Sequence, residues 1–303
     1  MQHFKILLLS ALLLFLSVPS IAQEENEEKD KDKEKKWRWE WQFDDLDFSL
    51  RKSKPTISLQ YGLSKVQRED LSTSIADPAL FELKLGYIKD KKAWGRDDII
   101  KHNFRYLFLS NISNDISGKE GTVDNLATDT WKFGFGRSSG YGYKLSESAA
   151  IIPYYTYTLN WSRVDFTKPD VLTIVPEPDA AIIDRYDESF RFGTSSEGGL
   201  RIQFIDNIAL EAGYERAIVF QRHLFWKWAG SAVIEGAAQG LLDTFINEVF
   251  KSSPAAGPIV NFVLKNALAY GIYELRQEKM NWPFSSEAPL AFDQFKVGVT
   301  FVF

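Results

Sequence analysis

The chain has 303 residues, no cysteine, 15% aromatic residues and a formal net charge of −5. The absence of cysteine excludes disulfide scaffolds, thiolate zinc sites, iron–sulfur centres and cysteine nucleophiles, and three histidines leave little for a histidine-rich metal site. A mildly acidic chain lacks the basic surface that nucleic acids require. We therefore expect no nucleic-acid partner and no cofactor.

Residues 1–22 are predicted to be a cleavable signal peptide. Lys5 precedes an apolar run from Ile6 to Leu16, and Ser20-Ile21-Ala22 places small residues at the cleavage positions. The apolar run is about half of the ~20 residues that a membrane-spanning helix needs. The mature chain is then expected to be exported and to begin at Gln23.

Two segments of unusual composition follow. Residues 23–36 are almost entirely charged, which predicts a disordered tail. In residues 37–55, Trp37, Trp39 and Trp41 alternate with polar residues. That period is typical of a strand, or of an extended segment with one aromatic face at a membrane interface, where tryptophan is favoured. We expect this segment to lie at the interface or in the periplasm.

From residue 56 to residue 303 the sequence alternates apolar and polar residues in eight runs. The runs centre on residues 57–64, 81–87, 104–109, 131–136, 155–161, 200–204, 208–215 and 295–303. Alternation with a period of two predicts half-buried β-strands. Long and short connections also alternate, as in an up-and-down barrel, although residues 89–100 are too long for a tight turn. Ten strands are the alternative count.

Alternation alone fits a soluble barrel or sandwich with its apolar face inward, or a membrane barrel with that face outward. The apolar side is crowded with Phe, Tyr, Trp and Leu, which would overfill the interior of a small barrel. The prediction is therefore a mainly-β protein, an antiparallel up-and-down transmembrane β-barrel of about eight strands.

The last strand, from Phe295 to Phe303, is an alternating aromatic and aliphatic run that ends on phenylalanine. It resembles the C-terminal signature of bacterial outer-membrane β-barrel proteins, and residues 198–214 look like a hairpin of the small OmpA and OmpX type. The resemblance implies location in the outer membrane of a Gram-negative bacterium, in contact with its lipid. It also implies that the outer-membrane assembly machinery reads Phe295, Phe301 and Phe303.

The polar face of the predicted strands carries charges of both signs. The candidate interior residues are Glu82, Lys84, Arg105, Lys132, Arg201, Glu211, Glu215 and Lys296. Opposite charges confined in a narrow interior should pair rather than hold a column of water. The sequence thus favours a plugged barrel with a structural or interaction role in the envelope. The alternatives are an envelope-lipid-modifying enzyme or lipid transporter, and a soluble periplasmic barrel that binds an apolar ligand.

Residues 224–279 depart from the strand pattern and predict a helical hairpin inserted before the last strand. A break at Ser252 to Gly257 is followed by Pro258, a residue favoured at the start of a helix. Ala232, Gly236 and Gly240 recur at a spacing that allows close helix packing. Counting strands places the hairpin on the outer face, where barrel loops, the outer leaflet or an unknown partner would cover its apolar stripe. An extracellular hairpin, one that lies in the plane of the membrane and one packed on the barrel remain open.

No catalytic constellation stands out. In the mature chain His102 and His223 are the histidines, and Ser231 and Glu235 follow His223 by two and three helical turns. That separation is too long for a local Ser-His-acid triad. We therefore predict no catalytic residue and no metal site, and expect that the protein is not an enzyme.

Overall fold

The computed structural model describes residues 53–93, 96–118, 125–167 and 176–303. The signal peptide, the charged tail and the tryptophan-rich segment fall in residues 1–52, outside the described part of the chain.

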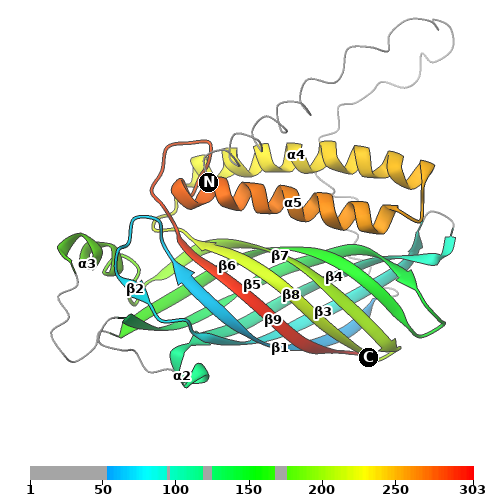
Figure 1. Ribbon diagram of the computed structural model, residues 1–303, viewed down its shortest axis with the longest axis horizontal. Coiled ribbons are helices and arrows are strands. Elements are labelled where there is room, and N and C mark those ends of the chain that lie inside the picture. Colours follow the sequence, from blue (N-terminus) through cyan, green and yellow to red (C-terminus); the bar gives the residue numbers. More distant parts are fainter. Residues whose placement is uncertain (1–52, 94–95, 119–124, 168–175) are drawn as a thin grey trace, which may run out of the picture. The chain divides into compact units, whose positions relative to one another are not determined.

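Eight long strands of the described residues form a closed antiparallel barrel (Figure 1). Each pairs with the next along the chain, and the last pairs with the first from Thr56↔Val302 to Gln67↔Ala291. A two-residue strand, β2 (Ser74–Ile75), pairs with β5 outside this ring. The predicted eight-strand barrel is confirmed. Its strands are β1 Lys54–Gln67, β3 Ala79–Ala93, β4 Arg96–Ser113, β5 Asn125–Lys144, β6 Ala150–Thr167, β7 Phe190–Ile205, β8 Ile208–Val219 and β9 Leu290–Val302.

The register places apolar side chains in rows on the outside of the barrel. Leu59 lies opposite Leu83, Leu83 opposite Leu109, Leu109 opposite Phe133, and Phe133 opposite Trp161. Leu109 is 47% exposed and Phe133 is 42% exposed. Because successive side chains of a strand point to opposite faces, the residues between them line the interior.

Two ends of the barrel differ in their connections. The loop end carries the long connections, residues 68–78, 114–124, 168–189 and 220–289, and the turn end carries the short ones. One short connection lies between Ala93 and Arg96. It is short because β3 and β4 extend well beyond the segments in which apolar and polar residues alternate. Residues 89–100 are therefore mostly strand and not a connection. The polar ends of these strands pair through backbone hydrogen bonds, which do not require apolar and polar side chains to alternate along the sequence.

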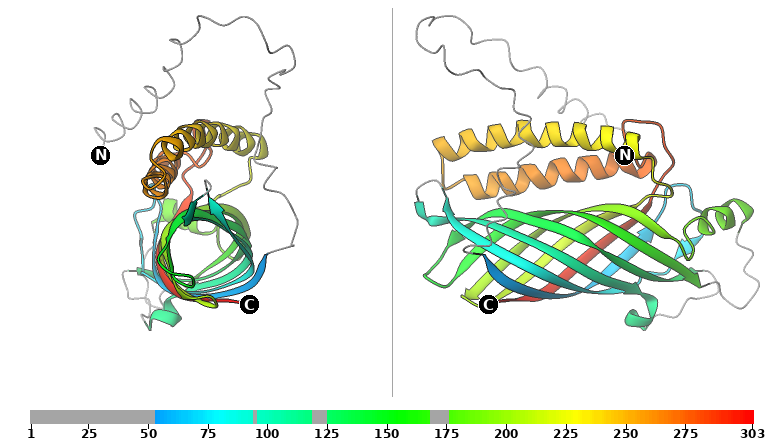
Figure 2. Two further views of the ribbon diagram at one scale, coloured as in Figure 1. Left: turned by 90° about the vertical axis from the view of Figure 1, so that its right-hand side faces the viewer. Right: turned by 180° about the vertical axis from the view of Figure 1, so that it is seen from behind.

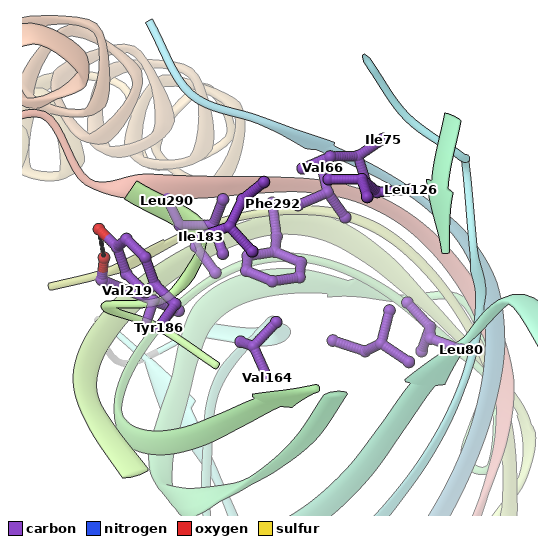
Figure 3. Packing of buried hydrophobic residues seen from close by; sticks show 12 residues of the cluster. Val66, Ile75, Leu80, Leu126, Val164, Ile183, Tyr186, Val219, Leu290 and Phe292 are labelled. Atoms are coloured by element: carbon purple, nitrogen blue, oxygen red, sulfur yellow. Dashed lines mark hydrogen bonds between the residues drawn. The ribbon is translucent and has the colours of Figure 1, made fainter. Parts of the chain in front are cut away.

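An apolar cluster fills the loop end of the interior (Figure 3). Leu80, Val164 and Phe292 point inward from the strands and meet Ile183 and Tyr186, which come from the connection between β6 and β7. That connection contains the short helix α3 (Glu177–Ile183), and the connection after β4 begins with α2 (Asn114–Ser117). The described part of the β6–β7 connection, residues 176–189, therefore contributes side chains to the apolar cluster at the mouth of the barrel.

The predicted hairpin consists of α4 (Phe225–Ser252) and α5 (Gly257–Glu278). It begins at the loop end but runs along the outside of the barrel wall, with α5 against β5 to β8 (Figure 2). Its tip reaches the turn end, where the Tyr143 hydroxyl donates to the Ala255 carbonyl oxygen at 2.6 Å. Of the three placements that the sequence leaves open, the structure has the hairpin packed on the barrel, whose wall covers one of its faces.

The small residues of α4 do not all serve helix packing as predicted. Gly240 is exposed, and a methyl group there would meet no atom within 4 Å. Close approach occurs instead at the tip, where a methyl group on Gly257 would lie 2.1 Å from the Phe250 ring. The spacing was misleading at Gly240 because that side of α4 faces away from both α5 and the barrel.

In the described part of the chain, no helix combines the length and the hydropathy that a membrane-spanning helix requires.

Two glycine-to-alanine substitutions should have opposite effects. Gly240→Ala should raise the free energy of unfolding by about 0.5–1 kcal/mol, because alanine is the better helix former in open space. Gly86→Ala should lower it by about 1–3 kcal/mol, because a methyl group at Gly86 would lie 2.0 Å from the Arg105 carbonyl oxygen. Denaturant unfolding in detergent micelles, followed by circular dichroism, measures both. Equal effects would contradict the close strand approach.

Candidate functional site: the charged barrel interior

A lysine surrounded by three carboxylates lies at the centre of the barrel. Lys296 Nζ on β9 is 2.9 Å from Glu82 Oε1, 2.7 Å from Glu197 Oε2 and 2.5 Å from Glu215 Oε2. The three acids come from β3, β7 and β8, and no side chain of this group is more than 3% exposed. Strands far apart in the sequence are thereby joined through one ammonium group.

Two further lysines extend the group. Lys132 Nζ donates to Glu215 Oε1 at 2.8 Å and to Gln294 Oε1 at 3.2 Å. Lys84 Nζ lies 3.3 Å from Glu82 Oε1 and 3.5 Å from Glu197 Oε2. It also stands 5.0 Å from the centre of the Tyr106 ring, a distance at which a cation is attracted by the ring face.

A second pair lies nearer the turn end. Arg201 Nη1 donates to Glu211 Oε1 at 2.6 Å, and Gln60 donates to the other oxygen of that carboxylate at 3.1 Å. The Tyr154 hydroxyl donates to Glu197 at 2.6 Å. The eight buried ionisable side chains described here, Lys84, Lys132, Arg201, Lys296, Glu82, Glu197, Glu211 and Glu215, carry four positive and four negative charges. This set of eight is thus electrically neutral, as deep burial requires.

The structure places most of the candidate interior residues in this network. Arg105 is the exception, and its assignment to the interior is wrong. It alternates on β4 with Phe104 and Tyr106, which are buried inside, and so it faces the outer side of the barrel. Apolar residues occupy both faces of this stretch of β4, and the pattern therefore could not show which face was inside.

Glu197 and Tyr154 are two interior residues that the alternation of the sequence does not reveal. Glu197 follows two serines and precedes two glycines, and this stretch has no apolar side chain that marks a face. Register supplies the missing signal, because Glu197 lies opposite Glu215 across β7 and β8. Tyr154 lies in a run of aromatic residues and faces the interior, whereas Tyr155 and Tyr157 face the outside of the barrel. Aromatic side chains on both faces conceal which face is inside.

The histidines occupy separate environments. His102 Nδ1 is 2.7 Å from Asp90 Oδ1, and the imidazole is buried. His223 packs among the rings of Phe192 and Trp228. Ser231 and Glu235 instead bind Arg276, at 2.9 Å and 3.0 Å. Among the described residues, no cluster of three or more His, Asp or Glu could hold a metal ion.

At the loop end, the carboxylate of Asp179 joins two connections, the one between β6 and β7 and the one between β1 and β3. Asp179 Oδ2 accepts hydrogen bonds from the Thr73 amide at 2.8 Å and from the hydroxyls of Ser72 and Thr73, both at 2.6 Å. Burial alone would raise the pKa of Asp179, but these hydrogen bonds outweigh burial, and the pKa lies below its ordinary value. The charged carboxylate therefore ties α3 to the connection between β1 and β3.

The described residues form a closed antiparallel barrel with a charged, paired interior and an aliphatic and aromatic exterior, and small transmembrane β-barrels share these features. No protein-family model and no curated protein sequence matches the chain. Solved structures similar to it include Neisserial surface protein A, with 11% identity and a TM-score of 0.37 over 82% of this chain and 97% of that one. The attachment invasion locus protein Ail of Yersinia pestis has 9% identity and a TM-score of 0.31, over 83% and 99%. The Pseudomonas putida toluene transporter TodX has 12% identity and a TM-score of 0.20, over 58% and 66%.

Removal of the central ammonium group should destabilise the barrel severely. Lys296→Met should lower the free energy of unfolding by about 3–5 kcal/mol, because it leaves buried carboxylates without their partner. Lys92→Met is the matched control, since the Lys92–Asp97 pair is 71% and 85% exposed and such pairs add little. Urea unfolding in micelles measures both variants. Similar midpoints for the two would show that the central contacts do not stabilise the fold.

The loop-end tie should depend on pH. The lowered pKa of Asp179 means that its stabilisation is present above the pKa of the unfolded chain, about 3.9, and is lost as the pH falls through the lower folded value. Hydrogen-exchange protection of the Thr73 amide, corrected for its intrinsic rate, should therefore decrease on acidification. Asp179→Asn should reduce that protection at neutral pH and flatten its pH dependence. Glu177→Gln, at an exposed position of the same helix, should retain the original profile.

Proposed function

We propose that the protein is an integral outer-membrane β-barrel whose interior is closed to water and ions, and that it serves the envelope as a structural or interaction protein. The observation that carries this proposal is the neutral, buried ion network around Lys296. A pore that conducts ions needs a continuous hydrated path with sites that an ion can enter and leave. Side chains bound to one another at the centre leave no such sites.

Apolar groups on both sides of the network support closure. The cluster around Phe292 lies on the loop side, and Ile88, Phe104 and Val302 form another toward the turn end. An eight-strand barrel has room inside for little more than side chains. The interior therefore resembles a protein core in which charges have replaced part of the hydrophobic packing.

The exterior supports a lipid environment. Phe81 is 48% exposed, Phe135 is 47% exposed and Leu107 is 67% exposed, on neighbouring strands. A soluble barrel would leave this surface in water, and contiguous apolar patches of that kind are rare on soluble monomers. Phe295 and Phe301 share the outward face of β9, and with Phe303 they form the proposed assembly signal.

Reconstitution tests both parts of the proposal. The protein should float with phosphatidylcholine vesicles in a density gradient, and in a planar bilayer it should give no stable conductance steps where a porin control does. Large, stable steps would overturn the closed interior. Recovery of folded protein at the bottom of the gradient would overturn the membrane location and favour the soluble barrel.

A further inference from the structure

We propose that the hairpin of α4 and α5 is itself embedded in the bilayer, with its outer face in contact with lipid acyl chains and its inner face on the barrel wall. This inference rests on the proposed membrane location of the barrel. It assigns a lipid partner to the segment that the sequence left without one.

The charges in the middle of the hairpin are directed away from its outer face. Lys265 is 2% exposed, and its Nζ lies 2.5 Å from Asp243 Oδ1 and 2.9 Å from the Gln239 side-chain oxygen. Arg276, 7% exposed, pairs with Glu235 at 3.0 Å. Both pairs join α4 to α5. Ionisable groups at membrane depth are expected to face protein and to pair in this way.

The outer face of the hairpin is largely apolar. Leu241 is 57% exposed, Phe245 46%, Ile259 56% and Val263 53%. From residue 229 to residue 247 the charged side chains are Glu235 and Asp243, which are 18% and 32% exposed and are paired with α5, and from residue 258 to residue 273 the one charged side chain is Lys265, which is 2% exposed. A stripe of this kind is unfavourable in water but matches the apolar exterior of the adjoining barrel strands.

The length of this apolar surface matches a bilayer. At 1.5 Å per residue, the stretches 229–247 and 258–273, whose charged side chains are paired between the helices, are about 27 Å and about 23 Å long. The apolar band of outer-membrane barrels is about 25 Å tall. Neither helix alone has the hydropathy of a membrane-spanning helix, because each carries charged side chains that pair with the other helix. Since the hairpin runs beside the barrel from its loop end to its turn end (Figure 2), its outer face would lie in the same apolar layer as the barrel wall.

The ends of the hairpin carry groups that suit the two membrane surfaces. Phe225, Trp226 and Trp228 flank Lys227 at the start of α4, and Trp226 is 83% exposed. Tryptophan and lysine are favoured at the boundary between lipid and water. At the opposite end, near the tip, Glu248 and Lys251 are exposed and lie close to the short turns of the barrel.

The wall beneath the hairpin is polar where the rest of the wall is apolar. Ser139, Thr194 and Ser196 take outward positions on β5 and β7, yet none is exposed. Gln239 of α4 donates to the Tyr157 hydroxyl, and Lys265 stands 5.6 Å from the centre of the Tyr155 ring. Acyl chains could not satisfy these hydroxyl groups. Over this section the hairpin covers the wall in place of lipid. Its own apolar outer face then contacts the acyl chains.

Site-directed spin labelling tests the inference, because the chain has no cysteine to remove. Single variants Leu241→Cys and Val263→Cys report on the hairpin face, Leu83→Cys on the barrel wall and Ser253→Cys on the tip. Each carries a nitroxide and is reconstituted in phosphatidylcholine vesicles. Collision rates with oxygen, which dissolves in lipid, and with a water-soluble nickel chelate are measured on samples with unchanged circular dichroism.

Labels at positions 241 and 263 should match the label at position 83, with oxygen collisions enhanced and nickel collisions reduced several-fold relative to position 253. If position 83 shows lipid contact while positions 241 and 263 behave like position 253, the inference fails and the membrane location stands. Nickel access at position 83 as well would overturn the membrane location itself. Dipolar broadening at position 241 that disappears on dilution with unlabelled protein would identify a second copy as the occupant, and would also overturn the inference.

Discussion

The pairing of charges inside a space that admits only side chains is the constraint on which this structure depends. Lys296 has three carboxylate partners, and each of those carboxylates comes from a different strand. A shift of register by one residue would turn every inward side chain outward and would leave these ions in contact with the apolar exterior. The ion network and the outer rows of Leu and Phe therefore fix the same register from opposite faces of one sheet.

The same constraint explains the packing of the hairpin. Lys265 and Arg276 are nearly as inaccessible as the ions in the barrel, and each is matched by an acid from the facing helix. Apolar contacts then hold the hairpin at its two ends. Phe220, Tyr273 and Met280 pack at the loop end, and Ile99, Ile246 and Phe250 pack at the turn end.

Period-two alternation was sufficient to predict the eight strands, because a sheet with one apolar and one polar face imposes that period on its sequence. It could not orient Arg105, where both faces of β4 are apolar, nor find Glu197 among small residues. The course of the hairpin was also beyond it. Contacts such as that between Gln239 and Tyr157 join residues that are distant in sequence. Helical periodicity shows that the apolar face of a helix will be covered, but it does not show which part of the molecule covers it.

Anchorage at both ends distinguishes this hairpin from a loop that closes over the barrel mouth. A lid would need one free end and an interface that water can enter, whereas here the base and the tip are both held by buried apolar clusters. The polar hydroxyl groups of β5, β6 and β7 would be exposed if the hairpin left the wall, and in a bilayer nothing would replace its hydrogen bonds. The hairpin is thus a fixed part of the perimeter. On one side of the barrel the outer surface is therefore formed by helices, and on the other sides it is formed by strands. This difference distinguishes one side of the barrel from the rest.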